Sequence, residues 1–483
     1  MNDVNGAVAG CPLRPEITPV APAPPPDPVR IRAHMFFDGT QNNMYNSEAG
    51  AVDVPWYAVG RAIHRATFGE GSYANDFSNI ARLYRSRPED QALEFSVYVE
   101  GMGTARGAVD DYSGGVAFGM GSTGVWQRAI QARDRLAEEI QARCPDRDAP
   151  LSVEITSWGF SRGAATARHF VWRVLTGEDG DTLEQRLTAA GYTVQAVQFL
   201  FGGLFDTVAS FGRNHDDDVA ELHLRAIARA AQVVHLAAAD EFRKNFRLTD
   251  IQSCGARGRE VFLPGAHSDI GGGYVDRVRE AVTVFQLPFD PDGASAEAAA
   301  YAEFPDAMPA SLQPRINEEQ RARDARVQAD RDWLVTHGWC TRTEAAITGS
   351  RIRVTRAGIR NTYSFIPLRL MAEFGRDAGV AFVPELETRH RPDAALEALR
   401  TDRGQSVEAA LRAHARGGRS AVDQWETPES WLTQLRHNWF HLSAEYDTSF
   451  SANVPQYFHD GRRWGESFQH VMHGRRMRRI MHG

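Results

Sequence analysis

The sequence predicts an α/β protein in which a mainly parallel sheet is flanked by helices. Short apolar runs alternate with stretches whose apolar residues recur at helical spacing, which is the pattern of repeated βαβ units. One apolar run leads through a glycine-flanked serine directly into a helical stretch. The length of 483 residues is sufficient for one large domain of this class together with a smaller accessory region.

The expected elements follow one another in a regular order. The first strand, at 30–37, ends in the turn Asp38-Gly39-Thr40. Apolar runs predict further strands at 95–99, 151–158, 194–205 and 260–263. Apolar residues near helical spacing predict helices at 126–140, 164–175 and 220–246.

The composition changes beyond about residue 285. Two later stretches, 316–334 and 392–416, are rich in alanine and charged residues and are expected to be exposed helices. Eight prolines lie between Pro12 and Pro28, which is typical of an extended linker or docking tail. We therefore expect a proline-rich leader at 1–30, an α/β catalytic domain at 31–285, and a mostly helical accessory region at 286–483 that packs partly on it.

The overall composition excludes several functional classes. A net charge of −8 gives no reason to expect nucleic acid as a partner. The cysteines are too far apart for a zinc site or a disulfide framework, and they are Cys11, Cys144, Cys254 and Cys340. No apolar run approaches the roughly 18–20 residues of a membrane span, and the first residues do not resemble a secretory signal. We expect a protein made in the cytoplasm without a signal peptide.

The strongest chemical signal is the segment Gly159-Phe160-Ser161-Arg162-Gly163, which lies between a predicted strand and a predicted helix. This arrangement is a nucleophile elbow, in which a strained turn exposes the serine and small neighbours permit the turn. The Arg162 amide and the helix N-terminus then face the developing oxyanion. The alternative is an ordinary turn serine between glycines. The sequence context favours a serine esterase of α/β-hydrolase type with Ser161 as nucleophile.

Such folds place an acid and then a histidine after the serine. Asp206 directly follows an apolar strand, where it can orient an imidazole; capping of the next turn is the alternative. His267 follows a short strand inside a glycine-rich loop and is the expected base, although it could be a surface histidine without a role. His169 and His235 fall in predicted helices and are expected to be packed or capped.

Two other motifs are interpreted as having no cofactor role. Gly119-Met-Gly121-Ser-Thr-Gly124 matches a dinucleotide-binding pattern, but it lacks a good preceding strand and an acid at the end of a following strand. We interpret it as a mobile loop near the mouth of the site. His215-Asp216-Asp217-Asp218 is interpreted as a solvated acidic loop. Neither a metal nor an organic cofactor is expected.

Five motifs in this order resemble a known family, namely the uncharacterised α/β-hydrolases that include the type VI secretion lipase effectors, which are antibacterial phospholipases. The motifs lie at 36–43, 100–104, 159–164, 205–208 and 264–274. The resemblance implies phospholipase A activity and carries a Ser–Asp–His triad onto Ser161, Asp206 and His267. It further implies that Asp38 braces its loop and that a Gly39 or Thr40 amide completes the oxyanion hole. Asp269 is expected to support the histidine loop.

The resemblance also implies partners and a destination. We expect a phospholipid membrane as substrate, a secretion spike protein and an immunity protein as partners, and delivery into the periplasm of a target cell. The basic tail with Arg475, Arg476, Arg478 and Arg479 suits contact with anionic headgroups or a frayed terminus. Two alternatives remain: an esterase acting on non-membrane esters, and a non-enzymatic effector that binds membrane.

Overall fold

A computed structural model describes most of the chain. The described residues are 27–50, 71–108, 110–111, 123–177, 181–209, 219–243, 245–287, 293–303, 305–418, 420–425, 427–444 and 480–482. Several expectations fall outside them: most of the proline-rich leader, most of the glycine motif that ends at Gly124, the acidic run at 215–218, and the four arginines of the tail. Within the described part, no helix combines the length and hydropathy that crossing a membrane requires.

The centre of the molecule is a six-stranded sheet in which every neighbouring pair is parallel. The strand order is β2-β1-β3-β4-β5-β7. The strands are β1 (Val29–Phe37), β2 (Glu94–Val99), β3 (Leu151–Phe160), β4 (Val194–Phe205), β5 (Gln232–Ala238) and β7 (Gly258–Leu263). The predicted fold class is therefore confirmed. Because the strands are parallel, the residues that follow β1, β3, β4 and β5 meet at one edge of the sheet.

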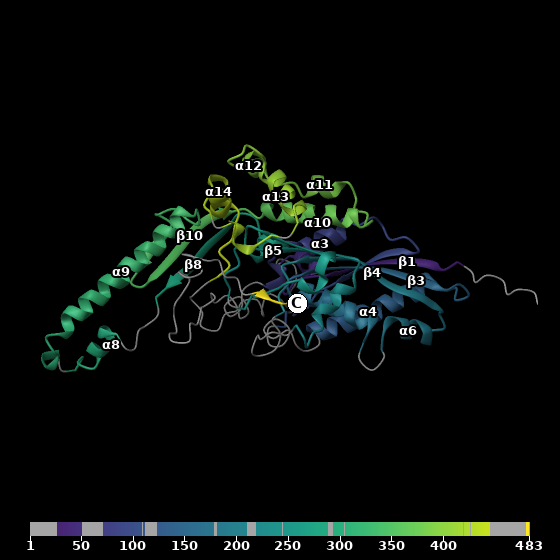
Figure 1. Ribbon diagram of the computed structural model, residues 1–483, viewed down its shortest axis with the longest axis horizontal. Helices are drawn as coiled ribbons and strands as arrows, with labels where there is room; N and C mark the ends of the chain where they lie inside the picture. The colour runs from purple at the N-terminus through teal and green to yellow at the C-terminus, as the bar shows by residue number, and fades with distance from the viewer. Residues whose placement is uncertain are drawn as a thin grey trace, which may run out of the picture.

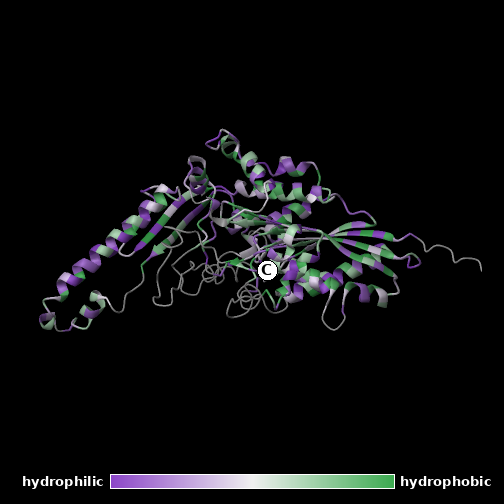
Figure 2. Ribbon diagram, in the orientation of Figure 1, coloured by the Kyte–Doolittle hydropathy of each residue, from purple (hydrophilic) through white to green (hydrophobic). Residues whose placement is uncertain are grey.

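Helices cover both faces of this sheet (Figures 1 and 2). One face packs against α4 (Val125–Arg143), α5 (Arg162–Leu175) and α6 (Leu183–Ala189) in a single apolar core. The other face packs against α3 (Asn79–Arg85) and α10 (Phe365–Asp377). Trp158 at the end of β3 is fully buried in this second core, 4.8 Å from the ring of Phe201 on β4. The end of β3 is thus fixed between well-packed layers.

One predicted helix is wrong. In the described residues of 220–246, the regular elements are the short 3-10 helix Leu224–Arg229 and then strand β5. β5 lies between β4 and β7, so almost all of its residues are buried and its sequence shows no alternation of apolar and polar residues. Without that alternation, an alanine-rich strand cannot be told from a buried helix by its pattern. His235 consequently lies on a strand.

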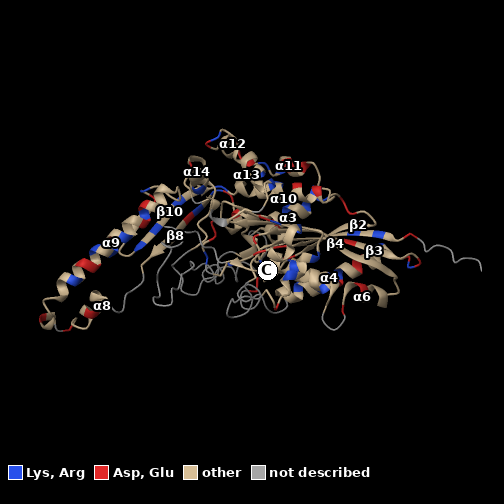
Figure 3. Ribbon diagram, viewed as in Figure 1, with Lys and Arg blue, Asp and Glu red and all other residues tan. Residues whose placement is uncertain are grey.

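The C-terminal region is largely helical, as predicted. It contains α8 (Ala294–Ala299), α9 (Leu312–Thr336), α11 (Glu385–Arg389), α12 (Ala394–Ala398), α13 (Val407–Arg416) and α14 (Ser430–Asn438), in addition to α10. The helix expected at 392–416 is therefore two helices. Mixed charges run along α9 (Figure 3), and its buried side chains are few: Leu312, Val327, Asp330 and Leu334.

The sequence did not predict a second sheet. β8 (Val278–Gln286), β10 (Arg351–Ile359) and β9 (Ala345–Thr348) form an antiparallel sheet in the order β8-β10-β9. β10 buries Ile352 and Val354 between exposed arginines, so its pattern is that of a sheet with one solvated face. The expected domain boundary at residue 285 falls inside β8. The remaining short elements are α1 (Met44–Ala49), α7 (His267–Gly271), β6 (Leu248–Thr249) and β11 (Ile480–Met481).

Candidate active site

Ser161 occupies the sharp turn between β3 and α5. Its backbone has φ 59° and ψ −131°, a conformation that a residue with a side chain adopts only under strain. The neighbouring glycines permit the turn: a Cβ on Gly159 would lie 2.4 Å from Ala164 Cα, and one on Gly163 would lie 2.1 Å from the Asp38 carbonyl oxygen. The roles predicted for Gly159 and Gly163 therefore have a direct steric reason.

Asp206 follows β4 at the same edge of the sheet. Its φ is 42°, and its N–H donates to the Leu236 carbonyl at 2.8 Å. One carboxylate oxygen accepts the Ala238 N–H at 2.7 Å, and the other lies 2.5 Å from Nδ1 of His267. These contacts come from β4, β5 and α7. They hold a fully buried carboxylate in one orientation against the imidazole.

His267 is the first residue of the short helix α7 and is 4% exposed. Its ring lies between two aromatic side chains, with centroids 4.6 Å from Phe160 and 4.9 Å from Phe246. Because Phe160 precedes Ser161 in the chain, this packing places the imidazole beside the elbow. Burial lowers the pKa of His267 below its usual 6.5, although the Asp206 carboxylate opposes that shift. A neutral ring that donates from Nδ1 to Asp206 leaves Nε2 free to accept a proton.

The expected oxyanion loop lies against the elbow. A Cβ on Gly39 would lie 2.6 Å from the Phe160 ring. The Gly39 N–H already donates to the Asp38 carboxylate at 2.7 Å, so of the two amides expected here that of Thr40 is better suited to an oxyanion. Within the described part of the chain, the N–H groups of Thr40 and Arg162 have no hydrogen-bond acceptor. Arg162 Nε donates to Thr40 Oγ1 at 2.7 Å, which joins the two backbone segments.

Asp38 is buried below this loop. The Tyr98 hydroxyl donates to its carboxylate at 2.6 Å and accepts the Met44 N–H at 2.9 Å. Burial raises the pKa of Asp38 to about 6. Asp38 thus connects β2, the loop after β1 and the start of α1, a geometry that suits the bracing role predicted for it.

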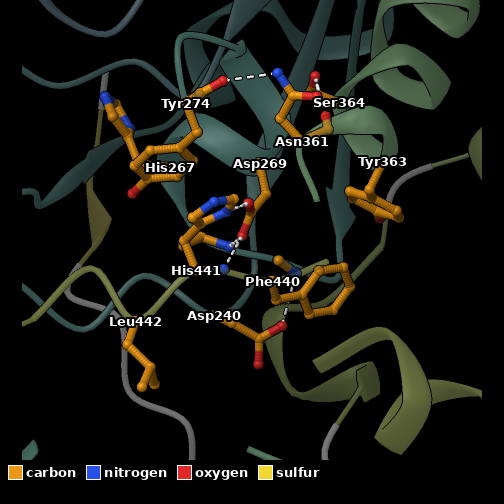
Figure 4. A network of polar contacts seen from close by, with 12 residues as sticks. Asp240, His267, Asp269, Tyr274, Asn361, Tyr363, Ser364, Phe440, His441 and Leu442 are labelled. Atoms are coloured by element: carbon orange, nitrogen blue, oxygen red, sulfur yellow. Dashed lines mark hydrogen bonds and ion pairs between the residues drawn. The ribbon is translucent and has the colours of Figure 1, made fainter. Parts of the chain in front are cut away.

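Asp269 joins the histidine loop to the C-terminal region (Figure 4). Its carboxylate accepts the Ala266 N–H at 2.8 Å, the His441 N–H at 3.1 Å and His441 Nδ1 at 2.7 Å. The His441 ring stacks on Tyr274 at a centroid distance of 3.9 Å. Burial raises the pKa of Asp269, and the contact with His441 opposes the shift. Asp269 therefore holds the backbone of Ala266, which directly precedes His267, and joins this segment to His441.

The sequence analysis missed two residues that hold this loop, His441 and Glu241. Glu241 accepts the His267 N–H at 3.2 Å and the Ser443 hydroxyl at 3.1 Å, and it pairs with Arg243 at 2.9 Å. His441 is separated from Asp269 by 172 residues, and no local pattern marks it. Glu241 lies in the stretch wrongly predicted to be helical, so its position just beyond β5 was hidden.

The two other histidines considered for the base have different partners. His169 Nδ1 donates to the Leu222 carbonyl oxygen at 2.9 Å, and burial lowers the pKa of His169 to about 4. His235 accepts the Thr207 N–H at Nε2 and lies 2.9 Å from Glu260 at Nδ1. It thereby supports the backbone just after Asp206. The described residues contain no cluster of histidine, cysteine and carboxylate side chains able to hold a metal.

Comparison with known proteins bears on this geometry. Residues 178–289, which include Asp206 and His267, match the model of the family described as type VI secretion phospholipase effectors, Tle1-like, catalytic domain. The resemblance indicated by the sequence motifs is confirmed. The Tle1-like match covers β4, β5, β7 and α7, the elements that bring the acid and the imidazole together. No curated protein sequence matches the chain.

Two solved structures are similar to this one. The structure of the Tle1 effector bound to the VgrG spike of the type 6 secretion system is 21% identical, with a TM-score of 0.55, and the alignment covers 87% of this chain and 85% of that one. This likeness extends the shared fold over the C-terminal region as well. An uncharacterised protein from Pseudomonas aeruginosa is 16% identical over 89% of this chain and 56% of its own, with a TM-score of 0.39.

Proposed function

We propose that the protein is a serine phospholipase of A type, which releases a fatty acid from a membrane phospholipid. The observation that carries the proposal is the 2.5 Å contact between Asp206 and His267 beside the strained Ser161. The match of residues 178–289 to Tle1-like phospholipase effectors supports a lipid ester as the substrate. An elbow serine, a buried carboxylate and a neutral imidazole are the groups that acyl transfer requires.

In the proposed mechanism, Ser161 Oγ attacks the acyl carbonyl carbon while His267 Nε2 takes the hydroxyl proton. The Arg162 and Thr40 N–H groups stabilise the oxyanion. The C–O bond to the glycerol breaks, and His267 returns the proton to the departing lysophospholipid oxygen. Water then attacks the acyl-enzyme, again with His267 as base. Fatty acid leaves and Ser161 regains its proton. Asp206 keeps the imidazole oriented and stabilises its charged form throughout.

The proposal includes delivery by a type VI secretion system into the periplasm of a target cell. The similar Tle1 structure was solved bound to a VgrG spike, which supports a spike protein as the delivery partner here. A phospholipid membrane as the substrate and a cognate immunity protein in the producing cell belong to the same proposal.

Labelling and product analysis test the proposal together. A fluorophosphonate probe should label the wild-type protein at Ser161 and should not label Ser161→Ala. Incubation with phospholipids that carry different acyl chains at the two positions should release one fatty acid and a lysophospholipid, and Ser161→Ala should release neither. Labelling without release from phospholipids, but with hydrolysis of soluble esters, would indicate an esterase for non-membrane substrates. Absence of labelling would refute serine catalysis and leave a membrane-binding effector.

A further inference from the structure

Arg162 is a cation placed directly after the nucleophile without a carboxylate partner. Its guanidinium makes one side-chain hydrogen bond, from Nε to the neutral Thr40 hydroxyl at 2.7 Å. Among the residues that the structure describes, no carboxylate oxygen lies within ion-pair distance of it. Nη1 and Nη2 therefore carry donors that have no acceptor among the described residues.

Three arginines with buried side chains are paired with carboxylates, whereas the fully buried Arg168 donates to the backbone carbonyls of Leu224 and Thr249. Arg82 pairs with Asp76 at 2.9 Å, Arg133 with Asp181 at 2.7 Å, and Arg356 with Glu280 at 2.7 Å. Arg162 is only partly buried, so water solvates part of its charge, and no described carboxylate neutralises the remainder. Desolvation lowers the pKa of Arg162 to about 10, so the side chain is still a cation at neutral pH and its charge is left uncompensated.

The position of Arg162 restricts which groups its guanidinium can bind. The Nε–Thr40 contact holds the side chain against the loop whose amide is proposed for the oxyanion hole. Because Arg162 directly follows Ser161 in the chain, this contact anchors the guanidinium beside the loop and the elbow where we propose that the ester binds. A guanidinium has planar paired donors that match two oxygens of a phosphate.

We propose that the Arg162 side chain binds the phosphodiester of the substrate and so selects glycerophospholipids over neutral glycerides. The proposal rests on the function proposed above and names a specificity-determining group for it. In a glycerophospholipid the scissile ester and the phosphate belong to the same glycerol. Anchoring the phosphate at Arg162 reduces the freedom of the acyl carbonyl relative to Ser161, which favours reaction.

The test compares two substrates with identical acyl chains, a phosphatidylglycerol and the corresponding diacylglycerol, both in the same detergent micelles. Arg162→Gln should lower kcat/KM for the phospholipid roughly 10- to 100-fold more than for the diacylglycerol. This factor corresponds to the free energy that a hydrogen bond to a charged group contributes. Arg162→Lys, which keeps the charge but not the paired donors, should fall between. Thr40→Val removes the acceptor that holds Arg162 Nε, so it should also lower the phospholipid rate more than the diacylglycerol rate, by a smaller factor than Arg162→Gln.

Inhibition of the wild-type enzyme gives a second readout. Glycerol 3-phosphate should inhibit hydrolysis of the diacylglycerol by the wild type and should inhibit Arg162→Gln much less. An equal loss on both substrates, with unchanged inhibition, would overturn the proposal and leave Arg162 as a support for the Thr40 loop. Free phosphate inhibiting as well as glycerol 3-phosphate would show that the phosphate alone is recognised. Persistent lipid hydrolysis by Ser161→Ala would instead refute the proposed function itself.

Discussion

Replacing Asp206 with asparagine tests the proposed triad with almost no change in shape. In the wild type, one carboxylate oxygen accepts the Ala238 N–H and the other accepts from His267 Nδ1. An asparagine amide has one acceptor and one donor group. If the asparagine oxygen still accepts the Ala238 N–H, the side-chain NH2 group faces His267 Nδ1. The imidazole must then carry its proton on Nε2. A ring in that tautomer cannot accept the Ser161 proton.

The structure also argues against the opposite amide orientation. Turning the amide would place NH2 against the Ala238 N–H and leave a buried backbone donor unpaired, at a cost of about 1–3 kcal/mol. The inactive tautomer is therefore favoured. In serine hydrolases this change lowers the rate by about 10⁴-fold, which corresponds to about 5.4 kcal/mol of transition-state stabilisation.

The assay is kcat/KM for fatty-acid release from phospholipid micelles by Asp206→Asn, measured beside the wild type and Ser161→Ala. Thermal unfolding should show that the asparagine variant is folded. Activity within tenfold of the wild type in a folded variant would refute the reasoning, because an acid that orients the base cannot be dispensable.

Two further predictions concern the histidine loop. Burial holds the pKa of His267 below 6.5, and only the neutral ring is a base. The acid limb of the kcat/KM profile should therefore have its midpoint below pH 6.5, and a midpoint above 7 would contradict the assignment. The unfolded chain binds more protons here as pH falls below 6.5, so this group lowers the free energy of unfolding toward acid pH. His441→Phe keeps an aromatic ring against Tyr274 but removes the 2.7 Å bond to Asp269. It should lower the free energy of unfolding by about 2 kcal/mol, as measured in urea, because a charged hydrogen bond in a buried site is lost; it should also lower kcat. Wild-type values in this variant would show that His441 does not position the loop.

The sequence could predict those parts of the molecule that depend on local pattern. The strand before Ser161 and the helix after it are adjacent in the chain, and the steric requirement at Gly159 and Gly163 acts on neighbouring backbone. Asp206 and His267 could be proposed because each follows an apolar run that ends at the same sheet edge. Their contact at 2.5 Å bears out that placement, whereas their catalytic roles await the experiments above.

The elements that the sequence did not reveal depend on distant partners. β5 shows no alternation because it has a strand on either side and helices or loops over both faces. Residues far away in the chain bury most of β5. For this reason the prediction of a helix in this stretch was wrong. Likewise, nothing near His441 marks it as a partner of Asp269. That pairing exists because the segment after α14 returns to the segment that carries His267 and Asp269.

The contacts of the histidine loop bear on how far the catalytic unit extends. The carboxylates of Asp269 and Glu241, which fix the backbone around His267, both accept hydrogen bonds from residues 441–443. β8 pairs with β10 across the boundary expected at residue 285, and α10 shares an apolar core with β3 and β4. A base held within about 0.5 Å of its working position needs supporting groups that are themselves fixed. Because the side chains that donate to these two carboxylates come from the C-terminal region, that region contributes to the geometry around His267.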